Sequence, residues 1–92
     1  MVESKIVVKH KVGLHARPAS VFVQKANKFA SEITVRNIST GGEPVDAKSI
    51  LMVLTLGVIQ NHEIELRADG PDEQQAMESL GDLVRSNFGE PE

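Results

Sequence analysis

The chain begins with an alternation of hydrophobic and polar positions. In residues 2–9 the even positions hold mostly small or hydrophobic side chains, whereas Lys5 and Lys9 occupy odd positions. A period of two predicts a strand with one buried face. The same alternation recurs over residues 32–37 and 62–68, so we expect two further strands there, the last with a charged outer face.

Other stretches carry hydrophobic residues at helical spacing. Over residues 16–28 the apolar positions recur every three or four residues. Pro18 suits the first turn of this helix, because a proline has no N–H to leave unpaired. Residues 49–56 fit either a buried strand or a short helix. We favour the helix, because Ser49 suits an N-cap and Gly57 suits a position just after a helix.

The last third of the chain predicts a third helix. Residues 69–73 combine Asp, Gly and Pro with acids in the first turn, which is a strong helix start. Gly89 and Pro91 are expected to end the helix. The stripe expected to face the core consists of Ala76, Met77, Leu80, Leu83, Val84 and Phe88.

The order of the elements predicts an α+β fold. A turn-rich segment over residues 37–44 leads into a weakly marked strand or loop near residues 43–47, which gives the order β-α-β-(β)-α-β-α. Such an order favours an antiparallel sheet with helices packed on one face. No linker or repeat divides the chain, so we expect a single domain over residues 1–92. Both ends complete the pattern, and we expect a free-standing protein.

Composition excludes several classes of protein. With 40% hydrophobic and 25% charged residues, the chain is neither a disordered tail nor a coiled-coil rod. The absence of Cys excludes disulfides, a thiolate nucleophile and a zinc site with Cys ligands, and we expect no metal and no cofactor. The longest apolar run is too short to span a bilayer, and the N-terminus lacks the pattern of a secretory signal. We therefore expect a cytoplasmic protein.

Charge is unevenly distributed along the chain. Residues 1–28 carry six Lys and Arg against one Glu, whereas residues 63–92 carry nine acids against two Arg. A basic first third could bind nucleic acid or an acidic protein. The chain has no Trp or Tyr, and its three Phe lie at helix-like spacings, so stacking platforms for bases are lacking. Nucleic-acid binding is therefore the weaker interpretation.

His15 is the residue best placed for chemistry. At the start of a helix, free backbone N–H groups and the positive end of the dipole form an anion site. Arg17 can offer a planar fork of donors to a phosphate group. The positive surroundings favour a neutral imidazole, whose free lone pair can attack phosphorus. By residue type alone a plain surface histidine is commoner. His10 and His62 lack such a setting, and we expect surface or structural roles for them.

Residues 13–20, Gly-Leu-His-Ala-Arg-Pro-Ala-Ser, resemble the active-site motif of the HPr family. These proteins are the histidine-containing phosphocarriers of the bacterial phosphoenolpyruvate-dependent sugar phosphotransferase system. Residues 47–51 and 54–57 resemble the block around the regulatory serine of that family, and residues 68–73 resemble its last strand-to-helix turn. The resemblance covers nearly the whole chain in the right order, and the histidine motif is highly specific.

The resemblance implies a fold and a role. The family fold is an open-faced β-sandwich, with a four-stranded antiparallel sheet covered on one face by three helices. His15 would accept a phosphoryl group on its Nδ1 from phosphorylated enzyme I and pass it to the A domain or subunit of a sugar-specific enzyme II. Arg17 would steady that group, and Ala16 and Ser20 would contact partners. The chain would be a carrier with a phosphohistidine intermediate, not an enzyme by itself.

Ser49 has two interpretations, which do not exclude one another. One is an N-cap whose hydroxyl bonds an early N–H of the helix. The other is a regulatory phosphoserine, written by HPr kinase/phosphorylase in bacteria that possess that enzyme. A phosphate is electrostatically tolerated at a helix N-terminus, and its roughly −1.5 to −2 charge would repel an acidic partner.

The run over residues 50–54 is more apolar than one helix face needs. Part of it should be exposed, and we expect Ile50, Leu51 and Leu54 to contact partners. By helical spacing, Ile50, Val53 and Leu54 could turn inward while Leu51 faces outward. Met52 and a longer segment at residues 39–44 depart from the family pattern.

An alternative function stays open beside that of a monomeric sugar-system carrier. A protein of the same fold could act mainly through phosphorylation-dependent binding of regulatory partners, in nitrogen regulation or in catabolite control. The intact His15 and Arg17 favour the carrier.

Overall fold

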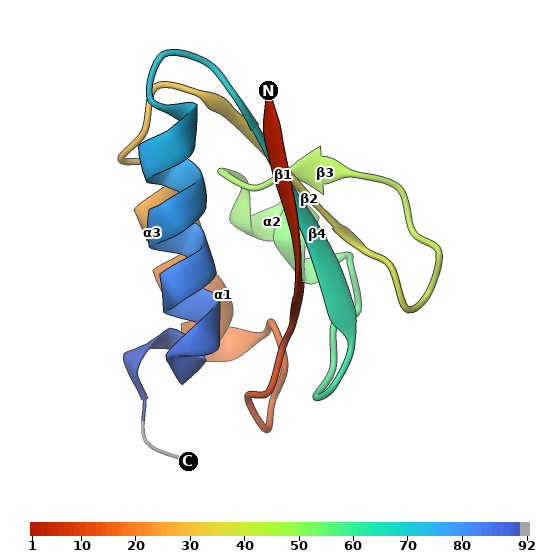
Figure 1. Cartoon of the computed structure of the whole chain (residues 1–92). Helices are drawn as coiled ribbons and strands as arrows, with labels where there is room; N and C mark the ends of the chain where they lie inside the picture. The colour runs from red at the N-terminus through yellow and green to blue at the C-terminus, as the bar shows by residue number, and fades with distance from the viewer. Residues whose placement is uncertain (91–92) are drawn as a thin grey trace.

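A computed structural model describes residues 1–90 of the chain, and the predicted helix-ending Pro91 lies outside that range. In Figure 1, α1 and α3 lie side by side against the strands, and α2 lies behind the strands in this view. The elements follow the order β1 (Val2–Val7), α1 (Ala16–Ala26), β2 (Glu32–Asn37), β3 (Val45–Asp46), α2 (Ile50–Leu54), β4 (Glu63–Asp69) and α3 (Glu73–Arg85), followed by the short 3-10 turn η1 (Asn87–Gly89).

The four strands form one antiparallel sheet with the order β1-β4-β2-β3. The central strand β4 pairs with both β1 and β2, so Ala68 lies opposite Val2 on one side and Ile33 on the other. Alternate residues of each strand face the helices, as the period of two in the sequence predicts. The α+β open-faced sandwich is confirmed, including the weakly marked third strand.

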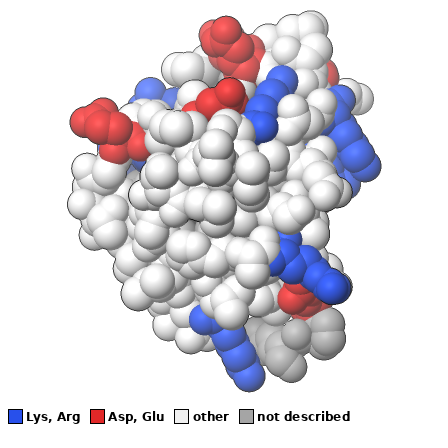
Figure 2. Space-filling model, turned by 180° about the vertical axis from the view of Figure 1, so that it is seen from behind, with Lys and Arg blue, Asp and Glu red and all other residues white. Residues whose placement is uncertain are grey.

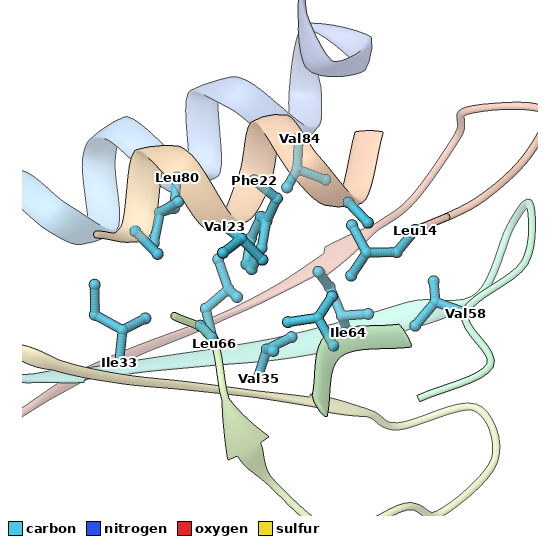
Figure 3. Packing of buried hydrophobic residues seen from close by; sticks show 14 of the residues in the cluster. Leu14, Phe22, Val23, Ile33, Val35, Val58, Ile64, Leu66, Leu80 and Val84 are labelled. Atoms are coloured by element: carbon cyan, nitrogen blue, oxygen red, sulfur yellow. The ribbon is translucent and has the colours of Figure 1, made fainter. Parts of the chain in front are cut away.

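The core lies between the sheet and the helices. In Figure 3, Phe22 and Leu80 of the helices point toward the sheet, and Leu66 and Ile64 of β4 point toward the helices. All four side chains are fully or almost fully buried. Burial on this scale is the main stabilising term in folding, at about 1.5 to 3 kcal/mol for each large side chain. The core extends at one end to Leu14 and Val58, which lie in the loops before α1 and before β4.

The outer face of the sheet is charged, but its centre is not solvated. Glu65 of β4 is only 5% exposed, because the long side chains of its cross-strand neighbours cover it. The Nε atom of Arg36 donates to Glu65 Oε1 at 2.9 Å, and the Nε atom of Arg67 lies 3.3 Å from the same oxygen. The hydrogen bond from Arg36 is the main cause that lowers the pKa of Glu65 below its ordinary value.

The end of α3 differs from the prediction. The buried stripe was expected to continue in helical conformation to Phe88, but α3 ends at Arg85. Asn87, Phe88 and Gly89 then adopt left-handed backbone conformations, with φ of 61°, 58° and 74°. Phe88 is buried in this turn even though it lies beyond the helix.

Two features are absent from residues 1–90. No helix in this range is long and apolar enough to cross a membrane. The same residues contain no group of three or more His, Asp or Glu placed to hold a metal ion.

Candidate functional site

His15 is the N-cap residue of α1. Its backbone is extended, with φ of −133° and ψ of 168°, and its ring makes no capping hydrogen bond. The N–H groups of Ala16 and Arg17 have no carbonyl four residues earlier within the helix, and Pro18 has no N–H. His15, which carries the imidazole, therefore lies next to free backbone N–H groups and the positive end of the helix dipole.

Ala16 enters the helix through a strained conformation. Its φ of 51° lies in the left-handed region, which a residue with a Cβ rarely adopts. Such strain persists only where the surrounding structure determines it, and it is common at functional sites. At this position the left-handed conformation of Ala16 sets the angle between the loop that ends at His15 and the start of α1.

The loop before His15 is held against the loop before β4. The N–H of the fully buried Leu14 donates to the carbonyl oxygen of Val58 at 3.0 Å. Gly13 has a φ of 68°, and a Cβ at this position would lie 2.1 Å from the Val58 oxygen. Only glycine fits so close to that backbone. This contact fixes the residue two positions before the imidazole.

Arg17 lies on the solvent side of the site. Its side chain is 80% exposed, and its Nε atom lies 3.9 Å from Oε1 of Glu90. The other carboxylate oxygen of Glu90 lies 2.9 Å from Nε2 of His10. The sequence interpretation gave Glu90 no role, because nothing in the spacing of the chain brings this residue back to α1. Only the left-handed turn over residues 87–89 does so.

The residues of α2 that face solvent form an apolar surface, here called the α2 patch: Ile50, Leu51, Met52 and Leu54. Leu51 is 74% exposed, as predicted. Ile50 and Leu54 are also exposed, so the inward orientation that helical spacing allowed for them is not adopted. The helix has a single turn, so one residue, Val53, supplies its whole buried side.

Figure 2 views the molecule from behind, the side on which α2 lies in Figure 1. A broad area without charged side chains occupies the middle of this face. Lys and Arg side chains lie along its right-hand and lower margins, whereas Asp and Glu side chains lie at the top and upper left. An uncharged surface that is basic along two of its margins is suited to docking a protein whose own rim is acidic on the matching sides.

The two serines among the predicted site residues have local partners. Ser49 is the N-cap of α2, and its Oγ accepts from the N–H of Met52 at 3.4 Å, so the capping interpretation is confirmed. On α1, Ser20 accepts a hydrogen bond from the side chain of Gln24 at 3.2 Å. The two helices are tied together where Asn27 donates to the carbonyl of Lys48 at 3.1 Å.

Comparison with known proteins places this site in a family. The family described as the PTS HPr component phosphorylation site matches residues 2–86. The chain is 42% identical to the phosphocarrier protein HPr of Xylella fastidiosa over 90 residues, or 98% of each protein. It is 44% identical to the HPr-like protein Crh of Bacillus subtilis over 85 residues, or 92% of this chain and 96% of that protein.

A solved structure agrees with these matches. The crystal structure of HPr-C-His from Thermoanaerobacter tengcongensis is 47% identical, with a TM-score of 0.94 and full coverage of both chains. The chain also matches multiphosphoryl transfer proteins of several bacteria, of whose length it spans only 18% to 24%. Because the family match covers nearly the whole chain and full-length relatives exceed 40% identity, the chain belongs to the HPr family of phosphocarrier proteins.

Proposed function

We propose that this protein carries phosphoryl groups in the bacterial phosphoenolpyruvate-dependent sugar phosphotransferase system. His15 accepts the group on Nδ1 from phosphorylated enzyme I, and the A domain or subunit of an enzyme II takes it onward. The observation that carries the proposal is the position of His15 at the N-cap of α1, beside free N–H groups and two residues before Arg17. Membership of the HPr family supports the same role.

The transfer replaces one nitrogen–phosphorus bond with another. The lone pair of Nδ1 attacks the phosphorus of the donor phosphohistidine, and the bond to the donor nitrogen breaks as the new bond forms. The bond energies are therefore nearly balanced, and the carrier contributes positioning and charge stabilisation. The N–H groups at the start of α1 and the exposed guanidinium of Arg17 are suited to the phosphoryl oxygens.

Partners would dock beside His15. The α2 patch supplies apolar contact area, Ala16 and Ser20 extend it along α1, and the basic margins steer acidic partners. Ser49 lies directly before the patch, so a phosphate added there by HPr kinase/phosphorylase would place negative charge against an acidic partner. We take the protein to be a cytoplasmic monomer of one domain that works without a cofactor.

The experiment uses purified enzyme I, phosphoenolpyruvate and magnesium, with the wild-type chain beside His15→Ala and Arg17→Lys. Intact mass and acid lability report the adduct. We expect one acid-labile phosphoryl group on the wild type and none on His15→Ala. Arg17→Lys keeps the charge but loses the planar fork, so we expect it to react about tenfold more slowly. An adduct that survives acid, or one that forms on His15→Ala, contradicts the proposal.

A second candidate is a regulatory protein that acts through partner binding, and the 44% identity to the HPr-like protein Crh favours it. Adding a panel of enzyme II A domains to the phosphorylated chain separates the two. A carrier loses its phosphoryl group to at least one domain, whereas a regulatory protein keeps it.

A further inference from the structure

His10 is a buried histidine whose surroundings are unusually well defined. It lies between β1 and the loop that leads to His15, and its side chain is 11% exposed. The ring of Phe88 meets it edge-on, with the two ring centres 5.9 Å apart and an angle of 71° between the planes. This packing comes from the C-terminal turn and leaves the imidazole with two polar contacts, one on each nitrogen.

The two contacts fix the position of the ring proton. The backbone N–H of Val12 donates to Nδ1 of His10 at 3.2 Å, and a backbone N–H can only donate. Nδ1 must therefore hold a lone pair, and the proton lies on Nε2. From there it is donated to Oε2 of Glu90, at 2.9 Å. A carboxylate that accepts from one nitrogen selects the tautomer, because the other nitrogen then remains an acceptor.

Through these bonds His10 organises the first part of the loop. Its ring binds Val12, and its carbonyl oxygen accepts from the N–H of Gly13 at 2.9 Å. The second part is held where Gly13 and Leu14 meet Val58. The loop before His15 thus has two anchors, and within the first the bond from Val12 depends on the tautomer of His10.

Glu90 is brought to the site at a conformational cost. Three consecutive left-handed residues precede it, two of which carry a Cβ, and such conformations are held only by compensating contacts. The side chain of Asn87 donates to the carbonyl of Glu90 at 3.2 Å. Oε1 of Glu90 is buried, and it faces Arg17 without accepting a hydrogen bond.

We propose that His10, held in its Nε2–H tautomer by Glu90, is a positioning residue for phosphoryl transfer at His15. The observation behind this is the chain of contacts from the Glu90 carboxylate through both His10 nitrogens to the N–H of Val12. The role rests on the proposed function, because its readout is transfer to His15. It gives the C-terminal turn of this chain a part in the site.

Two substitutions separate the two ring nitrogens. In His10→Asn the amide oxygen can take the place of Nδ1 and keep the bond from Val12. In His10→Gln the amide nitrogen takes the place of Nε2, so the bond to Glu90 is kept and the bond from Val12 is lost. We expect His10→Gln to slow transfer from phosphorylated enzyme I about fivefold, with an unchanged KM for the carrier. The rate of transfer to His10→Asn should stay within about twofold of the wild-type rate.

A spectroscopic readout tests the tautomer directly. Long-range proton–nitrogen correlation spectra of the wild type should show His10 as the Nε2–H tautomer and the Val12 amide as slowly exchanging. Glu90→Ala should speed exchange of that amide and slow transfer about as much as His10→Gln does. Asp82→Ala, which removes an exposed acid of α3 paired with Arg85, should leave both unchanged.

The outcomes distinguish this inference from the proposed function. An Nδ1–H tautomer in the wild type overturns the inference. So does transfer at the wild-type rate in both His10→Gln and Glu90→Ala. Should the wild type itself acquire no phosphoryl group, the proposed function fails and the role of His10 in transfer fails with it. If His10→Gln does not fold, exchange of the Val12 amide in Glu90→Ala and Asp82→Ala still decides, because Glu90→Ala also removes the carboxylate that faces Arg17 and transfer alone is then ambiguous. Unchanged exchange of that amide in Glu90→Ala overturns the inference.

Discussion

Asp72, the N-cap residue of α3, accepts hydrogen bonds from both the backbone N–H and the hydroxyl of Ser31, in the loop before β2. The N–H of Ala30 donates to its other oxygen at 2.9 Å. The Ser31 hydroxyl is the main cause that lowers the pKa of Asp72, followed by the Ala30 N–H. The carboxylate therefore fastens the start of α3 to the loop between α1 and β2.

This arrangement predicts a stability that depends on pH. The folded pKa of Asp72 lies below its unfolded value, so the contribution is fully present above the unfolded pKa and is lost as pH falls through the folded value. Asp72→Asn should lower the urea midpoint at pH 7, and the gap between variant and wild type should shrink below about pH 4.

Asp69→Asn serves as the matched control in the same urea titrations. Asp69 is the exposed last residue of β4, and its side chain forms an ion pair with the N-terminal amine at 3.8 Å. Its substitution should leave the midpoint nearly unchanged. The difference in urea midpoint between Asp72→Asn and wild type could instead be as large at pH 3 as at pH 7. The charge of the Asp72 carboxylate would then not be what stabilises the turn.

Gly81 offers a stabilising substitution. It lies within α3, and an added Cβ would meet only the end of the Arg85 side chain, 2.9 Å away, which can move aside. Alanine is better than glycine in a helix by about 1 kcal/mol, so Gly81→Ala should raise the free energy of unfolding by about 0.5 to 1 kcal/mol. Gly13→Ala, where the Cβ would strike the Val58 backbone, should lower it. Thermal unfolding of both variants measures this, and a destabilised Gly81→Ala would be inconsistent with the packing described.

Within α2, we expect exposed residues to affect docking and the buried residue to affect stability. Leu51 is 74% exposed, so Leu51→Ala should change the free energy of unfolding by less than about 0.5 kcal/mol. The same variant should raise several-fold the KM of enzyme I for the carrier. Val53→Ala, at a 1% exposed position, should cost about 2 kcal/mol of stability. Urea unfolding and steady-state transfer assays give the two quantities. If Leu51→Ala leaves the KM unchanged, the patch is not the docking surface for enzyme I.

Ser49 permits a test of charge without loss of the cap. Asp and Asn both cap helices as well as Ser does, so Ser49→Asp and Ser49→Asn should unfold at nearly the wild-type urea concentration. Only Ser49→Asp places a negative charge beside the α2 patch. We therefore expect this variant, and not Ser49→Asn, to raise the KM of enzyme I for the carrier. Equal KM values for the two variants would argue against regulation by charge at this position.

The sequence predicts the longer elements well and the short ones poorly. The bounds of β2 agree with residues 32–37, because its alternation has clear ends. The strand β3 has only two residues, Val45 and Asp46, which is too few to show a period. The helix α2 has one turn, so spacing could not tell Val53 from its exposed neighbours.

The candidate site shows the same limit. The positions of His15 and Arg17 follow from a local motif at a helix start, which sequence reasoning can find. The meeting of His10, Glu90 and Arg17 depends on left-handed conformations at Asn87 and Phe88. Asn adopts that conformation more often than most residues with a Cβ, but Phe does not, so the consecutive left-handed pair could not be predicted.

The most direct test of the account is phosphorus NMR of the chain phosphorylated by enzyme I, with nitrogen-15 in its histidines. We expect one phosphorus resonance, coupled to Nδ1 of His15 and absent from His15→Ala. Coupling to Nε2 of His15, or to a nitrogen of His10 or His62, would contradict it.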